Sequence, residues 1–178
     1  MKAVDVQRHL SRFQFTHKRV EAIASELRKE GCLPKAGRGP HAPDIQPGHA
    51  VELTLAVAGA ERIADATDVA LDLALFKSAT GRRLYFALTD SVWSVQKAEE
   101  IRHVRLMTEI GLAEIAYRDE RIEHFARDEL WNVEGFDAEI LSQDFAGRIG
   151  HIGGGVLREI ALEYQRNPGQ LETTEGAE

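Results

Sequence analysis

Apolar residues recur at helical spacing early in the chain. The stripe at i, i+3, i+4 and i+7, which places side chains on one face of a helix, consists of Val20, Ile23, Ala24 and Leu27. Thr16 precedes the stripe as a residue type that caps helices, and Gly31 follows it as a residue that allows the left-handed conformation in which many helices end. The pattern predicts a helix between Thr16 and Gly31.

A shorter helix and a loop flank this predicted helix. Ala3, Val6 and Leu10 predict a first helix over about residues 2–11, and residues 11–15 form the turn. After Gly31, residues 33–43 read LPKAGRGPHAP, a pattern typical of an extended entry, a flexible cationic loop and an extended return. Together these elements predict a helix-turn-helix followed by a wing.

The next segment is mainly apolar. Pro47 suits a first helical turn, and Asp65 or Thr67 is positioned to cap a further helix that runs to Phe76. Leu71 and Leu75 add a second apolar face to that helix. We therefore expect the helix to be buried, either in the core between the amino-terminal and carboxyl-terminal parts of the chain or between two subunits, and the core is the favoured location.

The second half changes character. Residues 83–88 (RLYFAL) are rich in aromatic residues and other strand formers, which predicts a strand. In residues 113–125, apolar and polar residues alternate on both sides of a polar turn, which predicts a hairpin of two strands. Ser91 is positioned to cap a helix of about a dozen residues, and the spacing over 152–165 predicts a last helix. The predicted fold class is α+β, with a winged helix-turn-helix head at 1–46, a helical connector that supports dimerisation at 47–79, an α+β body at 80–166 and a disordered acidic tail at 167–178.

Charge is distributed unevenly along the chain. The formal net charge is −7, from 22 Lys and Arg and 29 Asp and Glu. Residues 1–40 hold nine of the basic residues and four of the acidic ones, which leaves 13 basic and 25 acidic residues for the rest. A segment of +5 joined to one of −12 indicates a polyanion-binding head on an acidic body. A basic surface patch without a partner is the alternative.

The run LPKAGRGPHAP after an amphipathic helix, followed by the helix-start signal of Gln46 and Pro47, resembles the amino-terminal winged helix-turn-helix segment of bacterial phage and prophage proteins. It is also distantly similar to the winged head of MerR-type regulators. The resemblance covers about residues 1–60. It implies binding of double-stranded DNA, usually as a dimer, through the second helix and the wing.

Seven residues are the predicted DNA contacts. Lys18, Ser25 and Lys29 are expected to face the major groove and Arg19 and Arg28 the DNA backbone. Lys35 and Arg38 are expected at the adjacent phosphates or the minor groove.

The leading functional hypothesis is a sequence-specific regulator, a repressor of phage, prophage or mobile-element type that acts as a homodimer. One alternative is a DNA-recruiting assembly protein such as a phage terminase small subunit. The other is a phage-encoded inhibitor whose acidic body binds a host protein while its head regulates its own gene.

No pattern of residues indicates catalysis. Cys32 is the only cysteine, and the loop at 35–39 lacks the GK[ST] ending of a phosphate-binding loop. Glu100 with His103 and Glu120 with His124 have metal-ligand spacing, but a salt link is the favoured explanation for the second pair. The run GHIGGG at 150–155 indicates either an anion site at a helix start or, as the favoured explanation, a flexible hinge or a close backbone contact with the core. We therefore expect no enzyme activity, cofactor or metal. The absence of a long apolar run predicts a cytoplasmic protein.

Overall fold

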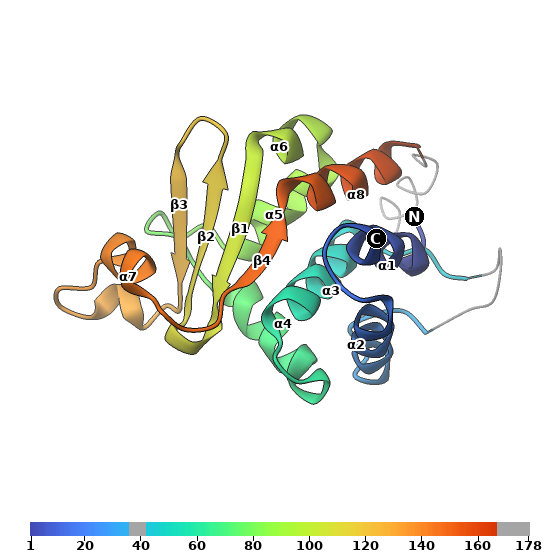
Figure 1. Ribbon diagram of the computed structural model, residues 1–178, viewed down its shortest axis with the longest axis horizontal. Coiled ribbons are helices and arrows are strands. Elements are labelled where there is room, and N and C mark those ends of the chain that lie inside the picture. The colour runs from blue at the N-terminus through green and yellow to red at the C-terminus, as the bar shows by residue number, and fades with distance from the viewer. Residues whose placement is uncertain (36–41, 167–178) are drawn as a thin grey trace, which may run out of the picture.

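The computed structural model describes residues 1–35 and 42–166 (Figure 1). The chain begins with four helices, α1 (Ala3–Phe13), α2 (His17–Lys29), α3 (Pro47–Gly59) and α4 (Ala66–Leu75), with a 3₁₀ turn at Ile63–Asp65 before α4. Two further helices, α5 (Leu84–Trp93) and α6 (Val95–Glu100), lead into strands β1 (Ile101–Met107), β2 (Leu112–Tyr117) and β3 (Ile122–Ala126). The chain ends with α7 (Ala138–Asp144), strand β4 (Gly150–Gly153) and α8 (Gly154–Arg166).

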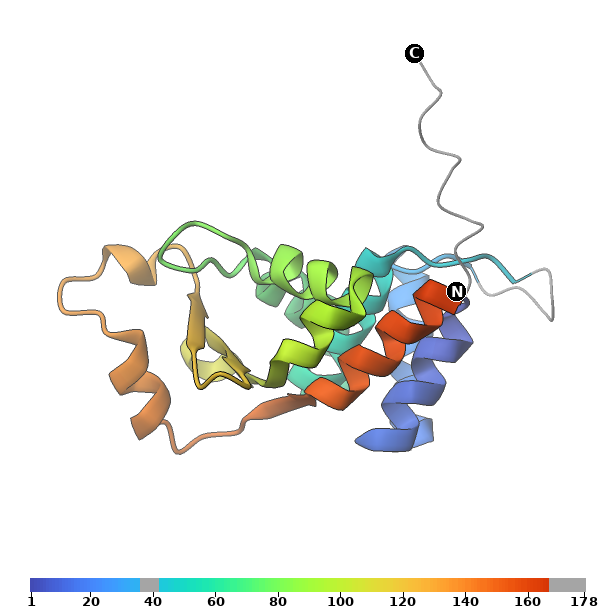
Figure 2. The ribbon, with the colours of Figure 1, turned by 90° about the horizontal axis from the view of Figure 1, so that it is seen from above.

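The four strands form one antiparallel sheet in the order β3-β2-β1-β4. One face of the sheet, which includes Val104, Ile115 and Ile152, packs into the main core beneath the helices. The opposite face contributes Met107, Leu112 and Ala126 to a small second core with α7. Figure 2 shows α7 on the far side of the sheet from α3, α5 and α8. The architecture is therefore a helical layer on one sheet face and a smaller cover on the other.

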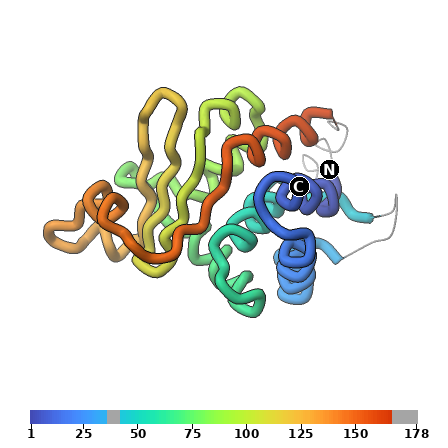
Figure 3. Tube along the Cα trace, viewed as in Figure 1, coloured from blue at the N-terminus to red at the C-terminus, as the bar shows by residue number. Residues whose placement is uncertain are grey.

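Helix α3 is the centre of the helical layer. Eleven of its thirteen residues are buried, as expected for a helix that is apolar around its whole circumference. Helices α2, α4 and α5 pack on α3, and α1 packs on α8, so the two ends of the described chain lie side by side (Figure 3). The apolar core is continuous from Met1 to Tyr164. Described residues on both sides of positions 46 and 79, among them Ile45, Ala50, Phe76 and Leu84, belong to this core.

The α+β fold class and the first two helices are confirmed. Thr16 caps α2 by accepting the Arg19 backbone N–H at 3.4 Å, Gly31 has φ +80°, and Pro47 lies in the first turn of α3. The wing is not confirmed, because within residues 1–35 and 42–100 the structure contains no strand beyond isolated bridges such as that between Lys2 and Asp44. The centre of the expected wing, residues 36–41, lies outside the described residues, and so does the expected tail.

Residues 84–88 form the first part of helix α5 and Arg83 precedes it as the N-cap residue, so the predicted strand is wrong. The buried positions Leu84, Ala87, Leu88, Ser91 and Val92 have helical spacing, and this face packs between α3 and α8. A short apolar run fits a buried helix as well as a strand, and here burial against other helices decides the outcome. Ser91 is likewise not a cap, because it lies inside α5, while Ser94 caps α6 by accepting the Lys97 N–H at 3.4 Å.

The glycine run is divided between strand β4 and helix α8. A Cβ atom on Gly150 would lie 2.4 Å from the Ala58 carbonyl oxygen, and one on Gly154 would lie 2.0 Å from the Ile101 carbonyl oxygen. These glycines therefore allow close backbone packing, which was one part of the favoured explanation of the pattern. The strand itself was missed, because four residues that begin and end in glycine give little alternation.

Candidate functional site

Helix α2 carries three of the predicted DNA contacts on its outer surface. Lys18, Ser25 and Lys29 are exposed, since they lie opposite the buried stripe that packs on α3. Lys29 Nζ lies 2.6 Å from Glu26 Oε2, and this hydrogen bond raises the pKa of the lysine. The outer surface of α2 therefore carries a lysine near each end, and the second of these lysines is paired with a carboxylate.

The side chain of Arg19 connects α2 to the end of α3. Its guanidinium donates hydrogen bonds to the carbonyl oxygens of Val57 at 3.3 Å and Glu61 at 3.4 Å, and also to that of Ala60. Arg148 donates to the carbonyls of Gly59 at 3.2 Å and Ala60 at 2.9 Å. Two arginine side chains thus donate hydrogen bonds to carbonyl groups at the C-terminus of α3, where unpaired carbonyls concentrate negative charge. Burial, and then the proximity of Arg148, lower the pKa of Arg19.

The remaining predicted contacts lie in different settings. Arg28 is half-buried, and its Nε is buried without a hydrogen-bond partner in the described chain. Lys35 is exposed at the end of the described segment, and Arg38 lies outside the described residues. The structure thus leaves Lys18, Ser25, Lys29 and Lys35 exposed to solvent, whereas the Arg19 guanidinium is hydrogen-bonded at the end of α3.

A hollow between α1 and the start of α2 adds cations that were not among the seven. Its volume is about 410 Å³, and its lining consists of Val4, Arg8, Ser11, Arg12 and His17. Arg8 Nη1 is 3.3 Å from Asp5 Oδ1, but the described lining of the hollow itself contains no carboxylate. The outward position of Arg8 and Arg12 on the first helix was predictable from its spacing. That they share a hollow with His17 depends on the α1–α2 packing.

A row of polar side chains crosses all four strands on the face opposite the main core. In register from β3 to β4 the row is His124, Glu114, Arg105 and His151. Arg105 Nη1 donates to Glu114 Oε1 at 3.0 Å, and His124 Nε2 lies 3.8 Å from Glu114 Oε2. Glu114 is only 3% exposed, so its carboxylate depends on these partners for compensation. His124 of β3 therefore faces Glu114 of β2, which is the cross-strand arrangement expected for its salt link.

Ser142 of α7 adds a hydroxyl to this row but does not form a catalytic relay. Its Oγ lies 3.4 Å from His124 Nε2, the same ring nitrogen that faces Glu114. A serine–histidine–carboxylate relay places the serine and the carboxylate on opposite ring nitrogens. Ser142 Oγ also donates to the Glu139 carbonyl at 3.0 Å. The geometry indicates a network that joins α7 to the sheet.

The other end of the row meets the turn between α1 and α2. The rings of His103 and His151 stack with centroids 5.2 Å apart, and burial followed by the nearby His151 lowers the pKa of His103. Gln14 Oε1 accepts the Gly153 N–H at 3.1 Å, while Gln14 Nε2 donates to the His151 carbonyl. The Gln14 amide therefore takes the place of a neighbouring strand along the edge of β4.

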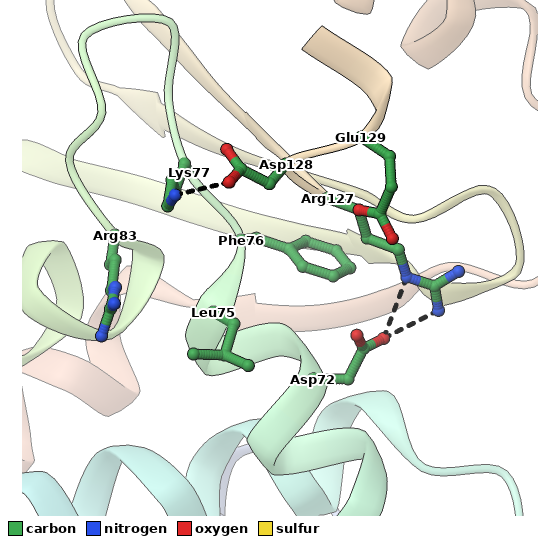
Figure 4. A pocket seen from close by; sticks show the side chains of 8 residues that line it. All are labelled: Asp72, Leu75, Phe76, Lys77, Arg83, Arg127, Asp128 and Glu129. Atoms are coloured by element: carbon green, nitrogen blue, oxygen red, sulfur yellow. Dashed lines mark hydrogen bonds and ion pairs between the residues drawn. The ribbon is translucent and has the colours of Figure 1, made fainter. Parts of the chain in front are cut away.

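A cavity of about 480 Å³ lies where the segment after α4 meets the end of β3 (Figure 4). Its charged groups are largely paired with one another. Lys77 Nζ is 2.7 Å from Asp128 Oδ2, and Arg127 Nη2 is 2.8 Å from Asp72 Oδ2. Because three cations and three carboxylates line the cavity, its walls favour neither an anion nor a cation.

Within the described residues, no three His, Cys, Asp or Glu side chains come together as metal ligands would. Glu100 ends α6 and His103 lies in β1, so this pair does not lie on one helix, where its spacing would have placed both side chains on the same face. No helix in the described part of the chain is both long and apolar enough to cross a bilayer.

Comparison of the chain with protein-family models, with curated proteins and with solved structures gave no match. Any functional proposal therefore rests on the chain's own residues and their arrangement.

Proposed function

We propose that this protein binds double-stranded DNA through helices α1 and α2, as a regulator of phage, prophage or mobile-element type. The observation that carries the proposal is the hollow between the two helices, which Arg8, Arg12 and His17 line. Arg8 lies 3.3 Å from Asp5 and His17 lies 4.0 Å from Glu21, but neither carboxylate lines the hollow itself. It lies beside a helix whose outer surface exposes Lys18, Ser25 and Lys29. Phosphate groups are the natural ligands of clustered guanidinium and ammonium groups.

The charge distribution supports a nucleic acid over a small anion. Nine basic residues lie within residues 1–40, whereas the remainder of the chain is strongly acidic. A basic region on an acidic body attracts a polyanion to one surface and repels it from the others. A single phosphate would need only one or two of these cations, while a duplex meets several of them together.

The dimensions of α2 suit a groove. Its 13 residues extend about 20 Å at 1.5 Å per residue, and a B-form major groove about 12 Å wide admits one helix. Lys18, Ser25 and Lys29 lie on the side of α2 away from the core, so they are the side chains that would approach base edges. Arg12 and the exposed Lys35 would contact flanking phosphates, while Arg19 would hold α2 against α3.

Salt dependence of DNA binding is the direct test. We would measure affinity by fluorescence anisotropy, with a labelled duplex of the region upstream of the gene and a random-sequence duplex, at several salt concentrations. The slope of log K against log salt should be negative for both, because bound cations release counterions. Substituting Arg12→Ala or Lys35→Ala should lower the magnitude of the slope by about 0.9 for each phosphate that the variant no longer neutralises.

Lys97→Ala is the matched control. Lys97 is exposed on α6, on the acidic part of the chain, and its Nζ is 3.5 Å from Asp90 Oδ2. Its removal should leave the slope unchanged. Binding that does not respond to salt, or an equal loss with Lys97→Ala and Arg12→Ala, would contradict the proposal.

A further inference from the structure

Strand β3 is the outer strand of the sheet, and the chain covers its free edge at one end only. Lys77 exchanges two backbone hydrogen bonds with Ala126, each of 2.8 Å. At Ser78 the chain turns away, with the Ser78 N–H donating to the Arg82 carbonyl at 2.8 Å. Lys77 therefore forms the first pair of a fifth strand that is not continued.

The backbone groups of His124 and Ile122 continue the line of that missing strand. Successive residues of a strand direct their N–H and C=O groups to opposite sides, so His124 and Ile122 point outward like Ala126. Neither has an outward backbone hydrogen bond within the described chain. The side chain of Ile122 is 48% exposed beside them. Unpaired edges of this kind are where added strands bind.

A groove of about 430 Å³ runs along this edge. One wall is the loop at residues 78–80, and the other is the segment that leads into α7, with Trp131, Phe136 and Ala138. Trp131 Nε1 donates to the Lys77 carbonyl at 2.8 Å and stacks edge-on against Phe136, so this wall is fixed. A space bounded on both sides fits one extended chain better than the edge of a second sheet.

The groove is acidic. Glu123, Asp137 and Glu139 line it, and its described lining contains no Lys or Arg. Glu123 accepts the Tyr117 hydroxyl at 2.9 Å and is 3.6 Å from Arg82, whereas Asp137 accepts the backbone N–H groups that begin α7. The Glu139 carboxylate has only the Gln143 amide as a partner in the described chain. The charge complementarity is therefore with a basic ligand.

We propose that β3 binds an extended, lysine- or arginine-bearing peptide segment of a partner protein, which adds to the sheet as a fifth strand at the Ile122–His124 edge. Backbone groups of Ile122 and His124 supply the strand pairing. Trp131 and Phe136 accept an apolar side chain of the peptide, and Glu139 faces its cation. This surface lies at the opposite end of the molecule from α1 and α2 (Figure 1), so it goes beyond the proposed DNA binding and does not depend on it.

Peptide selection on the intact protein tests the proposal. The probe is a displayed library of random twelve-residue peptides, and enriched sequences are synthesised and their affinities measured by isothermal titration. The expected sequences alternate apolar and β-branched residues with Lys or Arg. Ile122→Pro removes an outward N–H without removing a bond to β2, and Glu139→Lys reverses the charge of the groove. Each should weaken binding by about tenfold or more.

Matched substitutions outside the groove are the controls. Val133→Lys and Glu134→Lys alter exposed residues of the neighbouring loop and should leave peptide affinity unchanged. Circular dichroism confirms that each variant is folded, and either groove variant alone suffices for the test. The proposal is wrong if no peptide is enriched, or if the enriched peptides are acidic. Equal binding to the two groove variants and the wild type would also overturn it. A fall in oligomeric mass with Ile122→Pro would assign the edge to a second copy instead.

Discussion

Gly154 lies where edge strand β4 passes into helix α8, and no side chain fits there. A Cβ atom would be 2.0 Å from the Ile101 carbonyl oxygen and 3.1 Å from that of Arg102. Both obstructing oxygens belong to the backbone of β1, which cannot move without disturbing the sheet. Gly154→Ala should therefore lower the free energy of unfolding by about 3 kcal/mol, the upper part of the range for overpacking. Urea unfolding followed by circular dichroism measures the change.

The adjacent glycine provides the comparison. A Cβ on Gly155 would meet no atom within 4 Å, and the residue lies in the first turn of α8. Gly155→Ala should leave stability unchanged or raise it by up to about 1 kcal/mol, because alanine loses less entropy in a helix. Similar losses at both positions would show that the run is a flexible hinge rather than a packing contact.

At the scale of elements, hydrogen bonding to the C-terminus of α3 separates Arg19, which has a structural role, from the exposed cations of α2. Arg19→Ala removes the donors to the carbonyls of Val57, Ala60 and Glu61, although Arg148 remains at the same helix end. The free energy of unfolding should fall by about 1–2 kcal/mol. Lys18→Ala, one residue earlier and exposed, should change it by less than about 0.5 kcal/mol. Thermal unfolding of the two variants makes the comparison, and an unchanged melting temperature for Arg19→Ala would contradict the assigned role.

Local signals explain which elements could be predicted. The apolar stripe with Thr16 and Gly31 at its ends is contained in 16 residues, so α2 could be predicted with its cap and its exit. The hairpin of β2 and β3 could be predicted because its alternation is confined to residues 113–125. Helix α5 could not, since its identity depends on burial between α3 and α8, which are distant in sequence.

The polar row and the β3 groove could not be predicted from the sequence either, because their residues are also brought together by distant parts of the chain. Arg105, Glu114, His124 and His151 become neighbours only through the strand register, and no short motif encodes that pairing. Arg19 illustrates the converse. Its outward position on α2 suggested a contact to DNA, but carbonyls 38 to 42 residues later in the chain accept its hydrogen bonds.

At the scale of the whole molecule, the proposed DNA surface and the proposed peptide groove lie at opposite ends (Figure 1). Helix α4 lies beside α2 and carries a second apolar face that the described chain does not cover. Leu71 is 46% exposed and Leu75 is 57% exposed, one helical turn apart. An apolar stripe next to the helix that we propose to read DNA is suited to a two-fold contact that would place two α2 helices on successive half-sites. For the homodimer expected from the sequence, we therefore propose a contact through α4.

The double substitution of Leu71→Lys with Leu75→Lys tests this arrangement. It should convert the dimer to a monomer, because lysines facing each other across a two-fold axis repel, whereas exposed substitutions change monomer stability by only about 0.5 kcal/mol. Sedimentation velocity gives the mass. Affinity for a duplex with two inverted half-sites about 10 base pairs apart should fall more than affinity for one half-site. Ile140→Lys on α7 is the control, since Ile140 is also 57% exposed. A wild-type monomer would contradict the dimer, and a ring of many subunits would favour a DNA-recruiting assembly protein.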